Sequence, residues 1–264
     1  MDFETIRYEV SDHVVTITLN RPDVRNAMNY QSFQDLNNAF IAAQADTDVR
    51  CIILTGADPS FCSGDDMKQI MQKEAGQPSA AKALSARPRS VDATYTILDC
   101  EIPVIAAVNG AAVGWGMELT LFCDIRIASE HAKFAELFVK RALIPDVGGL
   151  QRLPAIVGPS NAARLLFTGD VIDAAEAQRI GLVSNVVPHD QLLDEARALA
   201  TRIAANAPLA LRHIKEGLRR AQHETTTELA TYCAATWAKL RQTEDHQEGI
   251  DSFTEKRPAV FRGR

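Results

Sequence analysis

The stretch that decides the fold is residues 103–124, PVIAAVNGAAVGWGMELTLFCD. It begins with the apolar run Val104 to Val108, which is long enough for a buried strand and too short for a helix. Asn109-Gly110 ends this run, because both residues favour turns. After a segment of small residues, 117–122 have the composition of the first turns of a helix. The stretch therefore predicts a strand, a glycine-rich turn and a helix start.

A turn of this kind can hold a negatively charged atom. Gly114 and Gly116 flank Trp115, and glycine lets the backbone approach a ligand closely. The first N–H groups of a helix lack intrahelical acceptors, and the helix dipole favours negative charge there. Glu118 lies three residues after Trp115, on the same side of the helix. We expect a site that stabilises a forming oxyanion next to a carboxylate that transfers protons.

A second turn of similar composition precedes it in the chain. The buried strand 51–54 leads into the loop 57–65, and a helix is predicted from about Asp66. If the two strands are neighbours, the N–H groups of Asp65 and Trp115 can converge on one ligand oxygen. One such oxyanion-hole donor is typically worth about 10²–10³ in rate. Two ordinary strand-to-helix turns have the same spacing, so the pattern leaves both interpretations open.

Composition excludes several classes of function. The net charge of −6 over 264 residues argues against a general nucleic-acid or membrane surface, and no apolar run approaches the ~20 residues of a membrane span. The five cysteines lack CxxC spacing, which favours buried thiols and a cytoplasmic location over a disulfide framework. The six histidines lack metal-ligand spacing, and no GxSxG, GxGxxG or GxxxxGK motif occurs. We therefore expect no metal and no nucleotide cofactor.

The order of elements predicts an α/β protein. A hairpin over 3–19 is followed by short strands that alternate with helices, which implies parallel crossovers, with Asn29, Ser160 and Asp173 as helix N-caps. After residue 190 the pattern is helical, over 192–205, 209–221 and 227–240. The predicted organisation is a core over 1–190 and a helical region over 191–264. Residues 77–90 are either a mobile loop near a ligand mouth or a plain surface insertion.

Six segments, in order along the chain, resemble the motif series of the crotonase family, the enoyl-CoA hydratase/isomerase superfamily. The resemblance implies a spiral of ββα units with a helical C-terminal trimerisation region, and a homotrimer or a dimer of trimers. It implies an acyl-CoA substrate, of which coenzyme A is a part rather than a cofactor, and a stabilised thioester enolate. The segments are NRPDVRNAMN (20–29), FCSGDDMK (61–68), IPVIAAVNGAAVGWGMELTLFCDIRIAS (102–129), IPDVGGLQRLP (144–154), FTGDVIDAAEAQRIGLV (167–183) and TEDHQEGIDSFTEKRPAVF (243–261).

The resemblance assigns roles to the residues of the central stretch. The two oxyanion donors fall on the backbone N–H groups of Asp65 and Trp115, and the first catalytic glutamate falls on Glu118. Trp115 replaces a glycine common in the family, so its indole is expected to narrow or redirect the acyl pocket. The second glutamate of the hydratases falls on Phe138, which can neither hold nor deprotonate water. Glu136 would share the face of Phe138 on a strand, but it is out of register with the family glutamate.

Residues for coenzyme A follow from the same resemblance. Arg25 and Ala27 are placed beside the phosphates and the adenine with Lys68 nearby, whereas Phe253 and Lys256 reach the coenzyme A of a neighbouring subunit. Each basic residue could equally be a solvated surface charge. A separate basic cluster is interpreted as a solvated helix face, and it comprises Arg212, Lys215, Arg219 and Arg220.

Asp146 decides which reaction is expected. Relatives that shift double bonds in dienoyl or ring-bearing acyl-CoAs, and those that displace aryl halide, are similar in placing a working aspartate there. Pro-Asp before Gly-Gly is also ordinary turn and N-cap chemistry. We predict double-bond isomerisation in which Glu118 and Asp146 exchange protons with the acyl chain. The alternatives are hydration of a 2-enoyl-CoA, hydrolytic or dehalogenase-like chemistry with Asp146 as nucleophile, and a catalytically weak acyl-CoA-binding scaffold.

Overall fold

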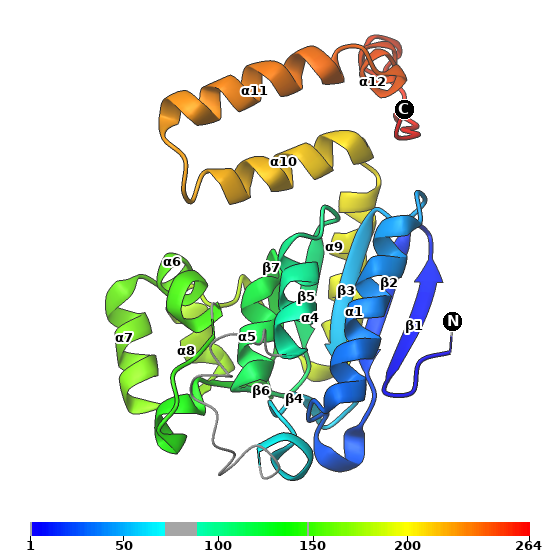
Figure 1. Ribbon diagram of the computed structural model, residues 1–264. Helices are drawn as coiled ribbons and strands as arrows, with labels where there is room; N and C mark the ends of the chain where they lie inside the picture. Colours follow the sequence, from blue (N-terminus) through cyan, green and yellow to red (C-terminus); the bar gives the residue numbers. More distant parts are fainter. Residues whose placement is uncertain (1, 72–88, 147) are drawn as a thin grey trace.

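The computed structural model describes residues 2–71, 89–146 and 148–264, and its strands form two sheets (Figure 1). One sheet has the order β1-β2-β3-β5-β7-β10 and the other the order β4-β6-β8-β9. β1 and β2 form the predicted hairpin, and the remaining neighbours in the first sheet are parallel, as the crossovers required. The strands are β1 (Ile6–Ser11), β2 (Val14–Leu19), β3 (Cys51–Gly56), β4 (Ser60–Cys62), β5 (Val104–Val108), β6 (Ala111–Val113), β7 (Ile125–Ser129), β8 (Lys133–Ala135), β9 (Ile172–Asp173) and β10 (Asn185–Val187).

The central stretch folds as its composition predicts, into β5, β6 and α5 (Trp115–Phe122). All five residues of β5 are buried, which explains a continuous apolar run in a sheet covered on both faces. Asn109 follows β5 and connects the turn after β5 to the turn after β3, because its side chain accepts a hydrogen bond from the Gly56 N–H (3.3 Å) and donates one to Asp58 (2.9 Å). The two chain segments that lead to the site are therefore held side by side by the sheets and by this amide.

Helices cover both faces of the first sheet (Figure 1). α1 (Tyr30–Ala45), α4 (Arg89–Leu98) and α5 pack on one face, and α9 (Leu192–Ala204) packs on the other. α9 thus packs with the core although it lies after residue 190. The shorter helical segments are η1 (Pro22–Val24), η2 (Met67–Met71), η3 (Leu137–Arg141), η4 (Gly148–Arg152), α6 (Leu153–Val157), α7 (Pro159–Thr168), α8 (Ala174–Arg179) and η5 (His189–Gln191).

Two of the three predicted N-caps are confirmed. Asn29 accepts a hydrogen bond from the N–H of Ser32, and Asp173 accepts one from the N–H of Glu176. The prediction for Ser160 is wrong, because α7 begins at Pro159 and its N-cap is Gly158, two residues before Ser160. Proline is favoured in the first turn because its missing N–H would have no partner there. Of the loop predicted over 77–90, residues 77–88 lie outside the described residues, and Arg89 already belongs to α4.

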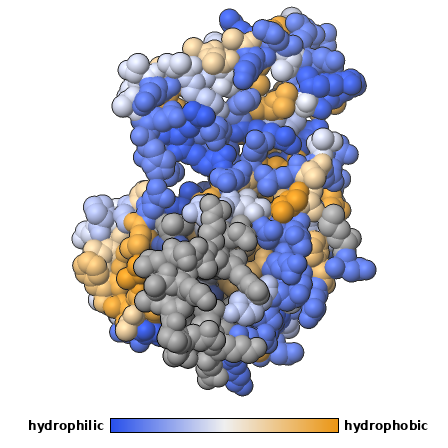
Figure 2. Space-filling view, in the orientation of Figure 1, coloured by the Kyte–Doolittle hydropathy of each residue, from blue (hydrophilic) through white to orange (hydrophobic). Residues whose placement is uncertain are grey.

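The last three helices project from the body of the molecule (Figure 1). They are α10 (Pro208–Arg220), α11 (Thr226–Leu240) and α12 (Glu244–Glu255), the last of which the sequence pattern did not reveal. Their surface is largely hydrophilic in Figure 2, yet several large apolar side chains are exposed on it, namely Ile214, Leu218, Trp237, Ile250 and Phe253. Within the described part of the chain, no helix combines the length and apolarity needed to cross a membrane.

The interpretation of the α10 basic residues as a solvated face is wrong for Lys215. This residue is buried, and its Nζ lies 2.7 Å from Asp124 Oδ2 and donates to the carbonyl of Ile102 (2.7 Å). Arg219 likewise donates to the carbonyl of Leu98 at the end of α4. These contacts attach α10 to the body, because a buried ammonium needs both an opposite charge and hydrogen-bond acceptors.

We predict that Lys215→Met lowers the free energy of unfolding by about 1–3 kcal/mol, because it removes the ammonium that pairs with the Asp124 carboxylate and donates to the Ile102 carbonyl. Urea denaturation measures the change. Arg212→Met is the matched control on the same helix, since its pair with Glu101 is long (3.8 Å) and exposed. That control should cost less than about 1 kcal/mol. Equal effects of the two substitutions would contradict the assignment of Lys215 as the anchor.

Candidate active site

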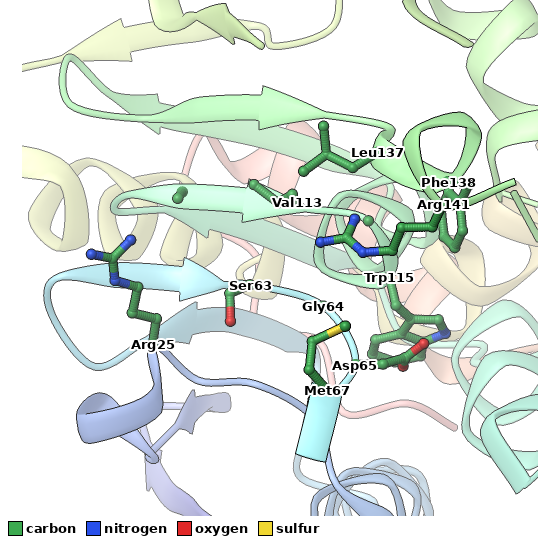
Figure 3. A pocket seen from close by; sticks show the side chains of 12 residues that line it. Arg25, Ser63, Gly64, Asp65, Met67, Val113, Trp115, Leu137, Phe138 and Arg141 are labelled. Carbon is green, nitrogen blue, oxygen red and sulfur yellow. The ribbon is translucent and has the colours of Figure 1, made fainter. Parts of the chain in front are cut away.

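A pocket opens where the turn after β4 meets the turn after β6 (Figure 3). Arg25 lies at one end of it, and Trp115 and Asp65 lie at the other. The whole lining is Arg25, Ser63, Gly64, Asp65, Met67, Ala111, Val113, Gly114, Trp115, Leu137, Phe138 and Arg141. The structure thus brings the two predicted glycine-containing turns to one cavity.

Glycine is required where the two turns touch. A methyl group placed on Gly64 would lie 2.8 Å from the Val113 carbonyl oxygen and 3.5 Å from the backbone nitrogen of Trp115. Gly64 also has a positive φ of 89°, which disfavours other residues. A methyl group on Gly116 would overlap the carbonyl of Cys62. The backbones of the two turns therefore approach each other more closely than side chains would allow.

The backbone of Asp65 is oriented by its bridge to Met28. The Met28 N–H donates to the Gly64 carbonyl, and the Asp66 N–H donates to the Met28 carbonyl, each at 2.8 Å. In a parallel bridge of this form, the N–H and carbonyl of the central residue point away from the partner strand. The N–H of Asp65 is therefore directed away from Met28. Both Asp65 and Trp115 line the pocket.

The backbone of Trp115 is fixed from the other turn. The Gly114 N–H donates to the Ala135 carbonyl (2.8 Å), and the Gly114 carbonyl accepts from Met117 (2.8 Å) and Glu118 (3.0 Å). Trp115 is the first residue of α5, where backbone N–H groups lie beyond the reach of intrahelical acceptors. The pocket therefore meets the positive end of this helix dipole.

The indole of Trp115 packs among aromatic rings. Its centroid lies 4.7 Å from that of Phe33 and 6.3 Å from that of Phe122, in edge-to-face geometries of 85° and 66°. Such pairs add about 0.5–1.5 kcal/mol beyond the burial of area. Trp115 and Phe138 both line the pocket, so aromatic groups stand where the acyl pocket was expected.

Glu118 is completely buried in the first turn of α5. Its Oε1 accepts a hydrogen bond from the Gly149 N–H (2.9 Å), whereas its Oε2 has no hydrogen-bond partner among the described residues. A methyl group on Gly148 would overlap Oε2, and one on Gly149 would lie 3.0 Å from Oε1. The absence of side chains at Gly148 and Gly149 therefore leaves the space that this carboxylate occupies.

The environment of Glu118 suits proton transfer near neutral pH. Burial raises the pKa of Glu118 to about 7, against the opposing effect of the Gly149 N–H, and the negative charge of Asp146 raises it further. Asp146 is half-buried just before η4, and its carbonyl accepts from the Leu150 N–H (3.2 Å). The structure thus places the two predicted carboxylates within electrostatic reach of each other.

Glu136 and Phe138 do not share a face. β8 ends at Ala135 and η3 begins at Leu137, so the strand that would have aligned them is absent from this segment. Phe138 lines the pocket, while Glu136 is 1% exposed and points into the protein. Burial, and then the charge of Glu118, raise the pKa of Glu136 to about 9. The condition for a shared face, a strand that continues through residue 138, is therefore not met. No motif in the sequence indicated that Glu136 would be buried.

The residues predicted for coenzyme A are divided between two places. Arg25 lines the pocket, and its left-handed backbone (φ 55°) lets its carbonyl accept from the Ser63 N–H (3.1 Å). Ala27 is buried nearby, and Lys68 is exposed on η2. Phe253, 87% exposed, and Lys256 lie at the end of α12, far from this pocket in Figure 1. Arg141, at the end of η3, also lines the pocket, and no motif indicated it.

Comparison with known proteins decides the family. The family described as enoyl-CoA hydratase/isomerase matches residues 9–264. The chain belongs to this enoyl-CoA hydratase/isomerase family. The resemblance to the crotonase superfamily and its fold is thereby confirmed, and the chain is an enzyme of the hydratase/isomerase type.

Several known proteins align with nearly the whole length of this chain. An (E)-benzylidenesuccinyl-CoA hydratase of Thauera aromatica is 38% identical over 260 residues, which cover 98% of this chain and 99% of the relative. A crotonyl-CoA hydratase of Syntrophomonas wolfei is 37% identical and covers 99% of each chain. A crystal structure of an enoyl-CoA hydratase from Bacillus anthracis superposes with a TM-score of 0.92 at 33% identity, covering 99% of this chain and 100% of that one.

We predict that Asp146→Asn lowers the pKa of Glu118 below about 7, because it removes a negative charge that opposes ionisation of the buried carboxyl. Carboxyl-carbon NMR titration of the protein, with Glu118→Gln to assign the signal, measures the shift. Asp99→Asn, an exposed aspartate at the end of α4, is the control and should leave the titration unchanged. An unchanged Glu118 titration in Asp146→Asn would show that the two carboxylates do not interact.

Proposed function

We propose that the protein isomerises a double bond in an unsaturated acyl-CoA by way of a thioester dienolate. The observation that carries this proposal is the buried Glu118 carboxylate with a pKa of about 7, next to a pocket lined by Asp65 and Trp115. Phe138 stands where hydratases of the family have their second glutamate. Asp146 remains as the second carboxylate near Glu118.

Proton transfer would begin at Glu118. Its carboxylate takes a proton from a carbon of the acyl chain, and the electron pair of the broken C–H bond passes into the conjugated thioester. The N–H groups of Asp65 and Trp115 stabilise the negative charge that develops on the thioester oxygen. The proton held by Glu118 is then returned at a different carbon, either directly or by way of the Asp146 carboxylate. The double bond moves, and no atom is gained or lost.

The pKa of Glu118 supports this role. A general base works best when its pKa lies near the operating pH, because it is then both ionised and basic. Burial raises the pKa of Glu118 into this range. Activity should therefore rise as the pH rises through about 7, the pKa of Glu118, because only the ionised form can accept the proton.

Hydration is the second candidate, and the names of the relatives favour it. The Thauera and Syntrophomonas proteins are both described as hydratases. In this chain, Glu118 and Asp146 would have to position the water between them, because Phe138 offers no acceptor. An aryl-bearing or dienoyl acyl group would suit the aromatic pocket, and the aryl-bearing substrate in the name of the Thauera relative supports that class.

One experiment separates these reactions. The protein is incubated with 2-enoyl-, 3-enoyl- and cyclic unsaturated acyl-CoA thioesters in deuterated water, and the products are analysed by mass spectrometry. Isomerisation gives deuterium exchange and a shifted double bond without uptake of oxygen, whereas hydration gives a 3-hydroxyacyl-CoA. In ¹⁸O-labelled water, label in Asp146 after one turnover would indicate a nucleophilic aspartate. Binding without exchange or product would indicate a scaffold.

Binding of coenzyme A is proposed to involve two subunits. Arg25, Ala27 and Lys68 would contact it from the chain that holds the pocket, and Phe253 and Lys256 from a neighbouring chain of a homotrimer or a dimer of trimers. The exposure of Phe253 and of other large apolar side chains on α10 to α12 supports packing of these helices against another chain.

We predict that Glu118→Gln reduces kcat by about 10²–10⁴ while the Kd for coenzyme A stays nearly unchanged, as expected for loss of a proton-transfer group. Turnover assays and isothermal titration calorimetry measure the two quantities. Glu130→Gln, at an exposed glutamate, is the control and should retain full activity. A fully active Glu118→Gln variant would remove this residue from the mechanism.

We predict that Phe138→Glu increases hydration of a 2-enoyl-CoA, because it restores a second carboxylate at the position used by the hydratases. The ratio of 3-hydroxyacyl-CoA to isomerised product, measured by chromatography, should rise. Phe138→Leu is the control for the change in pocket volume and should leave that ratio unaltered. If Phe138→Glu folds but forms no more hydrated product than Phe138→Leu, residue 138 does not decide the reaction.

A further inference from the structure

Unpaired polar atoms gather around the first turn of α5. The indole Nε1 of Trp115, Oε2 of Glu118 and both carboxyl oxygens of Glu136 are buried and have no hydrogen-bond partner among the described residues. Buried polar side chains nearly always have partners, so each exception needs a physical explanation. Trp115 and Glu118 belong to the site already described. Glu136 is the member of this cluster that the proposed mechanism does not use.

The sheet places Glu136 beside α5. Val113 of β6 pairs with Ala135 of β8, and the Gly114 N–H donates to the Ala135 carbonyl (2.8 Å). Glu136 follows directly, next to Gly114, whose carbonyl accepts from the N–H of Glu118 (3.0 Å). The backbones of the two glutamates are thus connected through two residues, Ala135 and Gly114.

The side chain of Glu136 lies behind the pocket rather than in it. Glu136 is not among the residues that line the pocket, although its neighbour Leu137 is. The residue is 1% exposed, and both of its carboxyl oxygens are buried. Its carboxyl therefore lies inside the protein, where the charge of Glu118 acts on it.

The surroundings of Glu136 disfavour a charge. An ionised carboxylate without donors in an apolar site is strongly destabilised, and it takes up a proton instead. The charged group that acts on Glu136 is Glu118 of α5, and both burial and this charge raise the pKa of Glu136, to about 9. Three other charged residues lie near this site. The charge of Asp146 raises the pKa of Glu118, and Asp65 and Arg141 line the pocket.

We propose that Glu136 is held as the neutral carboxylic acid behind Glu118 and acts as a positioning residue, so that the buried pair carries a single negative charge, on Glu118. This inference rests on the proposed function of Glu118 as the group that accepts the proton. In this proposal Glu136 is a second buried carboxyl that acts on Glu118 and does not contact the substrate.

The single charge has a consequence for the reaction. When Glu118 takes a proton from the acyl chain, the C–H electron pair moves to the thioester oxygen, and the negative charge moves with it. Glu136 keeps its proton throughout. Of Glu118, Glu136 and the acyl group, only the acyl group, as the dienolate, then carries a negative charge. If Glu136 ionises, a second negative charge faces the dienolate, and Coulomb repulsion in a buried site raises the cost of forming it. Activity should therefore fall as Glu136 loses its proton.

Infrared spectroscopy tests the protonation state without an assay of activity. At about pH 8 exposed carboxyls are ionised, so the protein should show the carbonyl stretch of a neutral carboxylic acid. The band should disappear as the pH rises through about 9, the pKa of Glu136, and it should be absent from Glu136→Gln and present in Glu130→Gln. No such band in the unmodified protein, or an unchanged band in Glu136→Gln, would overturn the proposal. The titration of the unmodified protein stands even if the variant fails to fold.

The pH dependence of kcat/KM tests the role. In the unmodified enzyme the profile should rise through about 7 and fall through about 9, the pKa values of Glu118 and Glu136. One pH unit beyond the upper pKa, the rate should be about tenfold below its maximum. Glu136→Gln should keep the lower limb and lose the upper one, a result that a merely structural role would not produce. An upper limb retained in Glu136→Gln, or absent from the unmodified enzyme, would overturn the proposal.

The two proposals fail in different ways. If Glu118→Gln is fully active, the function assigned to Glu118 is wrong, whatever the infrared band shows. If Glu118→Gln is inactive and the alkaline limb is unaltered in Glu136→Gln, the function stands and the inference about Glu136 alone is wrong.

Discussion

The structure depends on the close approach of two backbone turns, one after β4 and one after β6. Side chains are excluded there, because a methyl group on Gly116 would overlap the Cys62 carbonyl and one on Gly64 would press on Val113. The pairing of β4 with β6 sets the turns side by side, and the amide of Asn109 joins the two chain segments that lead into these strands. This contact brings Asp65 and Trp115, from two separate chain segments, to one cavity at the start of α5.

Electrostatics at the site follow from burial rather than from ion pairs. Glu118 is enclosed by Gly148 and Gly149, and the buried Glu136 carboxyl has no hydrogen-bond partner among the described residues. Phe138 lines the pocket at the position where the resemblance places the second glutamate of the hydratases. In the proposed mechanism, the carboxyls of Glu118 and Asp146 move protons along an acyl chain rather than hold a water molecule.

Local pattern predicted the central stretch, the hairpin, the parallel crossovers and the caps at Asn29 and Asp173, because each depends on residues close in sequence. It could not predict the burial of Lys215, which depends on Asp124 and a carbonyl from distant elements. Nor could it place Glu136, because the burial of its carboxyl near Glu118 depends on α5, which is distant in sequence. The family resemblance supplied the site residues, whereas the pKa of each carboxyl needed the three-dimensional surroundings.

The most direct measurement is a crystal structure of the protein with a saturated acyl-CoA, which binds but has no double bond to move. The account predicts that the thioester oxygen accepts hydrogen bonds from the backbone N–H groups of both Asp65 and Trp115, at about 2.7–3.1 Å, with the acyl chain directed toward Glu118. A thioester oxygen that contacts only one of these amides, or that points toward solvent with Glu118 remote from the acyl chain, would contradict it.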